Sequence, residues 1–153
     1  AEEAELSIKG LTPGMALHLA ECCHPLPGDR IVGVVEAGKG VVVHTIDCEN
    51  LENVLDKDDS LLDLSWQAKG EKPGIFAGRV EVVAANEAGV LANIATVVAK
   101  HDANISNLKI TARDPEFFTM RVDIEVRDVK HLTGIITALR TLGVVSSAKR
   151  LRG

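Results

Sequence analysis

Three cysteines and one histidine are the residues of this sequence best suited to binding a metal. They are the adjacent pair Cys22 and Cys23, followed further along the chain by His44 and Cys48. Three thiolates and one imidazole form a common ligand set of structural zinc sites. A zinc centre built from these four side chains is therefore one interpretation of the pattern.

The spacing of the cysteines leaves a second interpretation open. Neighbouring residues on a strand point to opposite faces, so Cys22 and Cys23 can share one metal only in a turn. The Cys-x-x-Cys spacing of many zinc sites is also missing. The alternative is that the cysteines are buried, reduced thiols that pack as small apolar side chains beside a hydrogen-bonded His44. An odd number of cysteines, two of them adjacent, does not favour a disulfide framework.

Catalysis by one of these thiols would need a nearby base, and His24 or His44 could serve. Neither an oxyanion loop nor a third orienting group accompanies them. Two other segments match catalytic motifs only in part. Gly38-Lys39-Gly40 lacks the spacing and the following helix of a phosphate-binding loop, and His101-Asp102 lacks further metal ligands. We predict a hairpin turn at the first segment, a helix end at the second, and no catalytic site.

The segment from Asn86 to Leu91 could bind a small anion. It is a loop of small and polar residues that leads into an expected helix, and free backbone N–H groups at a helix start attract a carboxylate. Gly89 permits close approach of a ligand. The same pattern also fits an ordinary helix start. If a ligand binds, the apolar residues Val90, Leu91, Ile105 and Leu108 favour an aliphatic side chain, as in a branched-chain amino acid.

The second half of the chain has the clearer periodicity. We expect a strand around Val80 and Val82, an amphipathic helix from Val90 to about His101, and a hairpin of the run 104–112 with Phe118–Val126. Asp128 can cap a second helix, Gly143 stands just past its end, and residues 144–151 form a last strand. The order βαββαβ predicts a ferredoxin-like four-stranded antiparallel sheet with both helices on one face. Because the other face is bare, we expect a homodimer.

The first half is less regular. The runs 31–35 and 40–44 are rich in valine and flank a glycine-bearing connection, which predicts a hairpin. A short helix from about Cys48 to Leu55 and a strand around Leu61 to Trp66 should follow. The core of such a module is thin, and a bound metal would stabilise it.

Charge separates the two halves near Pro73. Residues 1–72 contain 6 Lys and Arg against 14 Asp and Glu, whereas residues 73–153 contain 11 against 8, giving net charges of −8 and +3. We predict an α+β chain with domains at 1–72 and 73–153, joined near residues 68–74. Without an apolar run of about 18 residues or a secretory signal, we expect a cytoplasmic protein with no membrane segment.

Three segments of the first half resemble a known module. They are Cys22-Cys23-His24-Pro25-Leu26-Pro27-Gly28-Asp29-Arg30-Ile31-Val32-Gly33, Gly38 to His44, and Asp47-Cys48-Glu49-Asn50-Leu51. They resemble the conserved-cysteine module, also called zinc-finger or ribosome-intersubunit domain, of long RelA/SpoT-type (p)ppGpp synthetase/hydrolases. In that family an ACT domain follows, and the βαββαβ half is similar to one.

The resemblance implies a regulatory fragment that lacks the hydrolase and synthetase domains. It also implies contact with the ribosome and its rRNA in the full-length protein, a homodimer through the ACT domain, and an amino-acid ligand. Carried over by position, the ligand site comprises Asn86, Ala88, Gly89, Val90, Leu91, Asn104 and Ile105, the last two from the second strand or a partner chain. The sequence departs from the usual ACT loop at Asn86 and Glu87, and Thr45 follows His44 where the family usually has a basic residue. Three hypotheses result: an amino-acid sensor, a docking module for ribosomal RNA or dimerisation, and a thiol or zinc enzyme.

Overall fold

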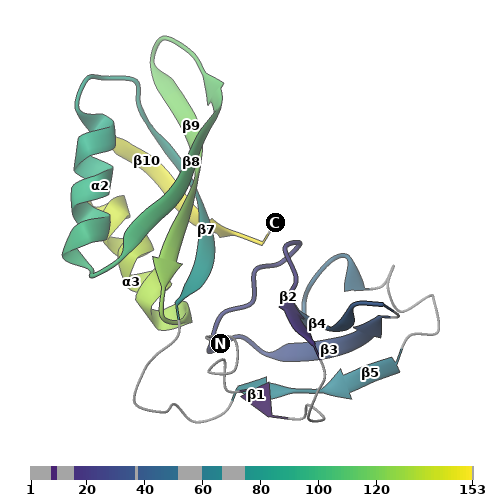
Figure 1. The fold of residues 1–153 in the computed structure, drawn as a ribbon. Coiled ribbons are helices and arrows are strands. Elements are labelled where there is room, and N and C mark those ends of the chain that lie inside the picture. Colours follow the sequence, from purple (N-terminus) through teal and green to yellow (C-terminus); the bar gives the residue numbers. More distant parts are fainter. Residues whose placement is uncertain (1–7, 10–15, 37, 52–59, 67–74, 153) are drawn as a thin grey trace. The chain divides into compact units, whose positions relative to one another are not determined.

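The computed structural model describes residues 8–9, 16–36, 38–51, 60–66 and 75–152 (Figure 1). The chain forms two compact units, one of residues 1–74 with 152–153 and the other of Ile75–Leu151. The α+β class and the ferredoxin-like arrangement predicted for the second half are confirmed. The limits 1–72 and 73–153 stay a prediction.

The first unit is built from short strands. A four-stranded sheet has the order β2-β4-β3-β5, in which only β2 runs parallel to its neighbour, and a separate pair joins β1 to β6. The strands are β1 (Ile8–Lys9), β2 (Leu17–Leu19), β3 (Ile31–Glu36), β4 (Gly40–Thr45), β5 (Ser60–Asp63) and β6 (Ser65–Trp66). The predicted hairpin is the antiparallel pair of β3 and β4.

The two faces of β4 bury different clusters. Val41 and Val43 pack with Ile31 and Leu64, whereas Val42, on the opposite face, packs with Ala20, Cys23 and Cys48. This alternation follows from the two-residue period of a strand. It places His44 on the same face of β4 as Val42, and therefore on the side of the cysteines.

The other predictions for the first half need adjustment. The predicted strand from Leu61 to Trp66 is divided at Leu64 into β5 and β6, which pair with different partners. The helix predicted from about Cys48 begins later, since residues 48–50 form a turn in which the Leu51 N–H donates to the Cys48 carbonyl, and Leu51 is the first helical residue. The rest of that helix, residues 52–55, lies outside the described residues.

The second unit has the order β7-α2-β8-β9-α3-β10. Its elements are β7 (Phe76–Ala85), α2 (Val90–Lys100), β8 (Asn104–Arg113), β9 (Phe117–Val126), α3 (Val129–Arg140) and β10 (Val145–Leu151). The strands form an antiparallel sheet of order β10-β7-β9-β8, and both helices lie on one side of it (Figure 1). The bare face and the free edges β8 and β10 are therefore as expected for this fold.

Alternating burial holds the two layers of the second unit together. Every second residue of β7 and β9 is buried, and so are Ile94 and Val98 of α2 and Leu132 and Leu139 of α3. Asp128 caps α3 as predicted, since its carboxylate accepts the His131 N–H. α3 ends at Arg140 with Thr141 as its C-cap, so Gly143 stands just past the end of the helix as predicted, without a positive φ.

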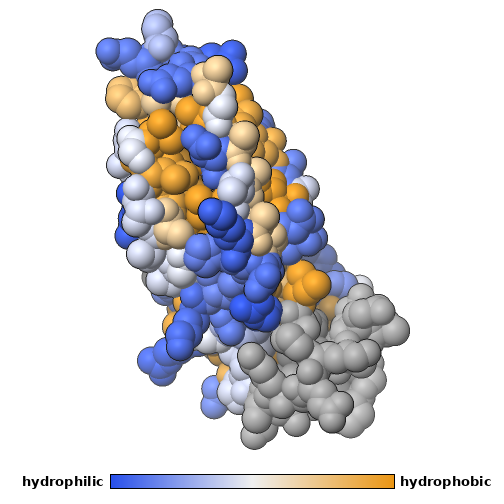
Figure 2. All heavy atoms as spheres, turned by 90° about the vertical axis from the view of Figure 1, so that its left-hand side faces the viewer, coloured by the Kyte–Doolittle hydropathy of each residue, from blue (hydrophilic) through white to orange (hydrophobic). Residues whose placement is uncertain are grey.

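The outer side of α2 is unusually apolar. Figure 2 looks toward the helix-bearing side of the second unit and shows an apolar area there. Leu91, Ala92, Ala95 and Ala99 of α2 are exposed. Among the described residues, no helix combines the length and hydrophobicity required to span a bilayer.

Candidate functional sites

The parallel pairing of β2 with β4 assembles the cysteine and histidine cluster. Leu19 at the end of β2 lies beside Val43, so the residues just beyond both strands lie at the same edge of the sheet. Cys22 and Cys23 lie in the turn after β2, where the His24 N–H donates to the Ala20 carbonyl. The requirement that the adjacent cysteines occupy a turn is thus met.

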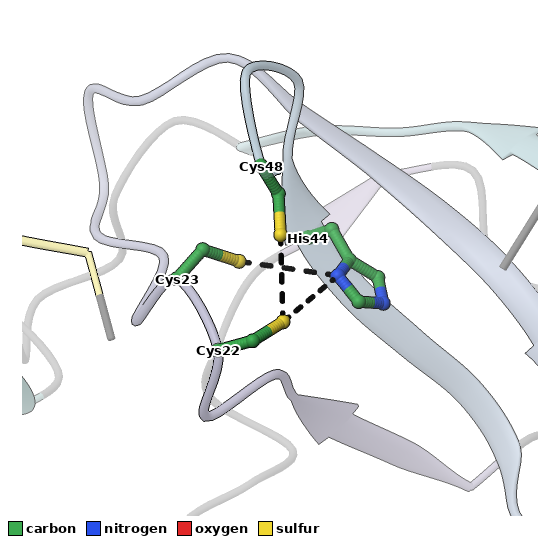
Figure 3. A group of neighbouring side chains, drawn as sticks. All are labelled: Cys22, Cys23, His44 and Cys48. Carbon is green, nitrogen blue, oxygen red and sulfur yellow. Dashed lines mark hydrogen bonds between the residues drawn. The ribbon is translucent and has the colours of Figure 1, made fainter. Parts of the chain in front are cut away.

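The four side chains converge on one point (Figure 3). His44 Nδ1 lies 3.5 Å from Cys22 Sγ and 3.9 Å from Cys23 Sγ, and Cys48 Sγ lies 3.4 Å from Cys22 Sγ. All four ligand atoms lie within 4.8 Å of one another. Tetrahedral zinc, with Zn–S bonds of about 2.3 Å and Zn–N bonds of about 2.0 Å, separates its ligand atoms by roughly 3.5 to 3.8 Å. The cluster therefore has the composition and nearly the spacing of a Cys₃His zinc site.

The surroundings of the thiols argue against a nucleophilic cysteine. Burial raises the pKa of Cys23 to about 12, and burial, followed by the hydrogen bond with Cys48, raises the pKa of Cys22. Burial also lowers the pKa of His44. A nucleophilic cysteine needs a lowered pKa and a thiolate beside a charged imidazole, which is the reverse of this arrangement. Neutral His44, by contrast, has a lone pair ready for a metal.

One member of the site was not predictable from side-chain types. The backbone N–H of Thr45 donates to Cys23 Sγ over 3.3 Å. Such a bond supports a thiolate, because it supplies a donor within an otherwise apolar cluster. Any residue type except proline provides this donor, so the sequence carries no signal for it.

The second candidate site is the loop before α2. Gly89 has φ +85°, and an added Cβ there would meet nothing within 4 Å, so the space beside this residue is open. No side chain caps α2, in contrast to α3 with its Asp128 carboxylate. Ala88 is exposed, Val90 is buried and Leu91 is 43% exposed. The helix start thus offers backbone N–H groups next to an apolar surface.

Asn86 is held at the far end of this loop. Its side-chain Nδ2 donates to the Asp114 carbonyl over 2.8 Å, and its backbone N–H donates to the Glu116 carbonyl over 2.9 Å. Asn86 therefore fastens the loop to the turn between β8 and β9. Glu87, whose charge would oppose a carboxylate, is exposed.

The last two predicted ligand residues lie at the other end of the unit. Asn104 pairs with Glu125, which pairs with Ala77, whereas the loop leaves the sheet after Ala85. Eight residues of strand separate these levels, roughly 26 Å at about 3.3 Å per residue. A single chain brings together Asn86, Ala88, Gly89, Val90 and Leu91, but not Asn104 and Ile105.

Both halves match known protein families. Residues 6–67 match the family described as the RelA/SpoT RIS domain, and residues 72–150 match the family described as the ACT domain. GTP pyrophosphokinase rsh of Brucella ovis is 38% identical over 97% of this chain and 20% of its own length. The bifunctional (p)ppGpp synthase/hydrolase SpoT of Escherichia coli K12 is 29% identical over 96% of this chain and 20% of its own length. The chain thus spans about a fifth of the length of these curated relatives.

A solved structure is similar to the second half alone. It is the ACT domain from a GTP pyrophosphokinase of Chlorobium tepidum, which is 28% identical and has a TM-score of 0.44. The match covers 50% of this chain and 99% of that one.

Proposed function

Because this chain belongs to the ACT domain family over residues 72–150 and matches the RelA/SpoT RIS domain over residues 6–67, we propose that it is the regulatory segment of a (p)ppGpp synthetase/hydrolase. Its ACT domain binds a branched-chain amino acid, such as valine or isoleucine. Binding shifts the balance between alarmone synthesis and hydrolysis in the stringent response. Such a shift requires that the two states of the enzyme have different affinities for the amino acid.

The single observation that carries the proposal is the difference between the two helix starts. α3 is capped by its own Asp128, whereas α2 begins at Gly89 without a side-chain cap and faces open space. The orphan N–H groups and the positive end of the helix dipole favour a carboxylate. A free amino acid supplies that carboxylate, and Val90 and Leu91 beside it favour an aliphatic side chain.

A homodimer would complete the site. The edge strand β8 is free on one side, and two β8 strands paired antiparallel would place Asn104 and Ile105 of one copy at the level of the other copy's ligand loop. The exposed Leu91 and the alanines on α2 lie next to this edge strand in the fold and add apolar area to the interface. We therefore propose that the amino acid binds between two ACT domains.

Calorimetry on the whole chain tests the sensor proposal. Valine, isoleucine and leucine should bind with similar stoichiometry, and lysine and glutamate should not. The Gly89→Ala protein should bind valine more weakly, because its backbone leaves the left-handed conformation that exposes the helix start. Gly143→Ala is the matched control, since that glycine has ordinary φ and open space around it. No heat from any aliphatic amino acid at millimolar concentration would refute amino-acid sensing.

We further propose that Cys22, Cys23, His44 and Cys48 hold zinc. The ion would supply structural cross-linking of a unit whose described strands are short. The chain's own residues set up this site: the turn after β2 presents two thiols, β4 presents His44, and the Thr45 N–H supports Cys23.

A second candidate function is docking to ribosomal RNA, favoured by the match of residues 6–67 to the RIS domain. Arg30 is exposed and could contact a phosphate. Docking alone predicts RNA binding that is unchanged by valine and weakened in Arg30→Gln. Sensing predicts valine binding that Arg30→Gln leaves intact, so the two experiments separate the candidates.

A further inference from the structure

His131 connects the two helices of the second unit. It stands three residues after the N-cap Asp128, whose Oδ1 accepts the His131 backbone N–H over 2.7 Å. The imidazole turns back so that Nδ1 accepts the Arg127 backbone N–H over 3.0 Å. The opposite ring nitrogen, Nε2, is hydrogen-bonded to the backbone carbonyl of His101, the residue that ends α2.

These partners fix the protonation of the ring. A backbone N–H can only donate and a backbone carbonyl can only accept. Nδ1 must therefore carry a lone pair, and Nε2 must carry the hydrogen. His131 is thus a neutral imidazole in its Nε2–H form, because a second hydrogen on Nδ1 would oppose the Arg127 N–H.

The arrangement is a variant of the capping box with an added function. In a capping box the third helical residue, usually Glu or Gln, returns a hydrogen bond to the backbone before the helix. His131 makes its return bond one residue earlier, to the N–H of Arg127 before the N-cap, and has a second nitrogen left for another partner. That partner is one of the last carbonyls of α2, which no i+4 residue of the helix can satisfy. One side chain therefore makes a hydrogen bond at the start of α3 and another at the end of α2.

The His101 side chain leaves this carbonyl accessible. Its Nδ1 is hydrogen-bonded to the Val97 carbonyl over 2.9 Å, within its own helix. α2 also packs through the buried Val90, Ile94 and Val98, and the Ala103 N–H, just before β8, donates to the Val98 carbonyl. Apolar contact is non-directional and permits sliding along the helix axis, whereas a hydrogen bond at the helix end resists it.

We propose that His131 is a positioning residue for the ligand site: by holding the end of α2 in place, it sets where Gly89 and the open helix start stand. The inference rests on the proposed function, because α2 is the helix whose start receives the carboxylate. α2 has 11 residues and behaves as one rigid rod, so a shift at His101 is passed on to Gly89.

Three substitutions separate the two bonds of the ring. In His131→Gln the amide nitrogen stands near the place of Nε2 and still donates to the His101 carbonyl. In His131→Asn the amide oxygen stands near the place of Nδ1 and still accepts from Arg127, but the bond to α2 is lost. His131→Ala loses both. Valine affinity of the whole chain should stay within about twofold for the Gln protein and fall about tenfold for the Asn and Ala proteins, as expected for one hydrogen bond.

Nitrogen NMR of the histidine rings gives a readout that does not depend on valine. At neutral pH the His131 ring should show a lone pair on Nδ1 and a hydrogen on Nε2. Hydrogen exchange at the Arg127 amide should be slow in the wild type and in the Asn protein and faster in the Gln protein, which also shows that each variant folds.

The outcomes distinguish the two proposals. A charged ring or an Nδ1–H form overturns the inference whatever valine does. If the wild type binds valine but the Asn and Gln proteins bind it equally well, the positioning role is wrong and amino-acid sensing stands. If the wild type binds no aliphatic amino acid, the sensing proposal fails and the positioning role for a ligand fails with it.

Discussion

Arg79 and Asp123 form a two-bond ion pair across β7 and β9 on the sheet face that bears no helix. Arg79 Nε lies 2.7 Å from Asp123 Oδ1, and Arg79 Nη2 lies 3.1 Å from Asp123 Oδ2. The side chains are only 18% and 14% exposed. Lys149 and Glu81 form another cross-strand pair on the same face. A face lined with ion pairs tolerates water, so pairing through the edge strands, not stacking of bare faces, is the better route to a dimer.

We predict that the Arg79–Asp123 pair stabilises the second unit measurably. Asp123→Asn should lower the free energy of unfolding by about 1 to 2 kcal/mol, because it weakens a charge-assisted, two-bond contact that is largely shielded from water. Urea denaturation followed by circular dichroism measures the change. Glu81→Gln is the control, since the Lys149–Glu81 pair is longer, at 3.7 Å, and more exposed, and its loss should cost less than about 0.5 kcal/mol. Equal effects of the two substitutions would contradict the prediction.

A metal prediction concerns the first unit. The purified chain should contain one zinc ion per chain, and Cys48→Ser or His44→Ala should reduce this content strongly, because three ligands hold zinc much less tightly than four. Elemental analysis measures it. His18→Ala is the matched control, since His18 bonds the Lys39 carbonyl outside the cluster.

The same variants should differ in stability. Trp66, the only tryptophan, lies in the first unit and donates from Nε1 to the Asp29 carbonyl, so its fluorescence reports the unfolding of that unit. A chelator should lower the unfolding midpoint of the wild type and of His18→Ala, and should leave that of His44→Ala unchanged. If the chelator does not change the unfolding midpoint of the wild type, the result favours buried, reduced thiols without a metal.

The sequence predicts the second unit better than the first, for a physical reason. The alternation from Phe118 to Val126 is strict because one face of β9 is buried, and Asp128 is recognisable as a cap from its type alone. The partner of β2 was not predictable, since three residues are too few to show a period and parallel pairing is a long-range choice. For that reason the adjacent cysteines and the missing Cys-x-x-Cys spacing did not favour zinc, although the fold places Cys22 and Cys23 in a turn.

The two segments of the proposed ligand site show the same difference between local structure, which the sequence predicts, and long-range placement, which it does not. The loop from Asn86 to Leu91 is contiguous in sequence, so its geometry follows from local chemistry. Asn104 and Ile105 lie at the other end of α2, and only the register of the sheet shows that one chain separates them from the loop. His131 had a local signal, its spacing three residues after Asp128, but its bond to α2 is again long-range.

The metal-free first unit should be most stable between about pH 6.5 and pH 9. Burial raises the pKa of Cys23 from 9.0 to about 12, so the stability present below pH 9 is lost as the pH rises toward 12, where the unfolded thiol ionises more readily. Burial lowers the pKa of His44 below 6.5, so the stability present above pH 6.5 is lost as the pH falls. Trp66 fluorescence in urea with a chelator, measured across this range, gives the profile. A midpoint that continues to rise from pH 9 to pH 11 would contradict it.

Two glycines of one hairpin should respond very differently to alanine. Gly38 and Gly40 both have positive φ, at +82° and +100°, so alanine is strained at either position. An added Cβ at Gly38 would meet nothing within 4 Å, and Gly38→Ala should cost about 1 to 2 kcal/mol of unfolding free energy from strain alone. At Gly40 the Cβ would lie 2.5 Å from the Ala16 carbonyl oxygen, whose carbonyl also accepts the Val41 N–H. This backbone cannot move aside without breaking that bond at the entry to β2. Gly40→Ala should therefore cost about 3 kcal/mol or more, measured by Trp66 fluorescence in urea.

Gly40→Ala should also reduce the zinc content of the protein, since β2 leads to Cys22 and Cys23, whereas Gly38→Ala should retain the metal. Equal stability and equal zinc content in the two proteins would show that the contact between Gly40 and Ala16 does not position the cysteine turn.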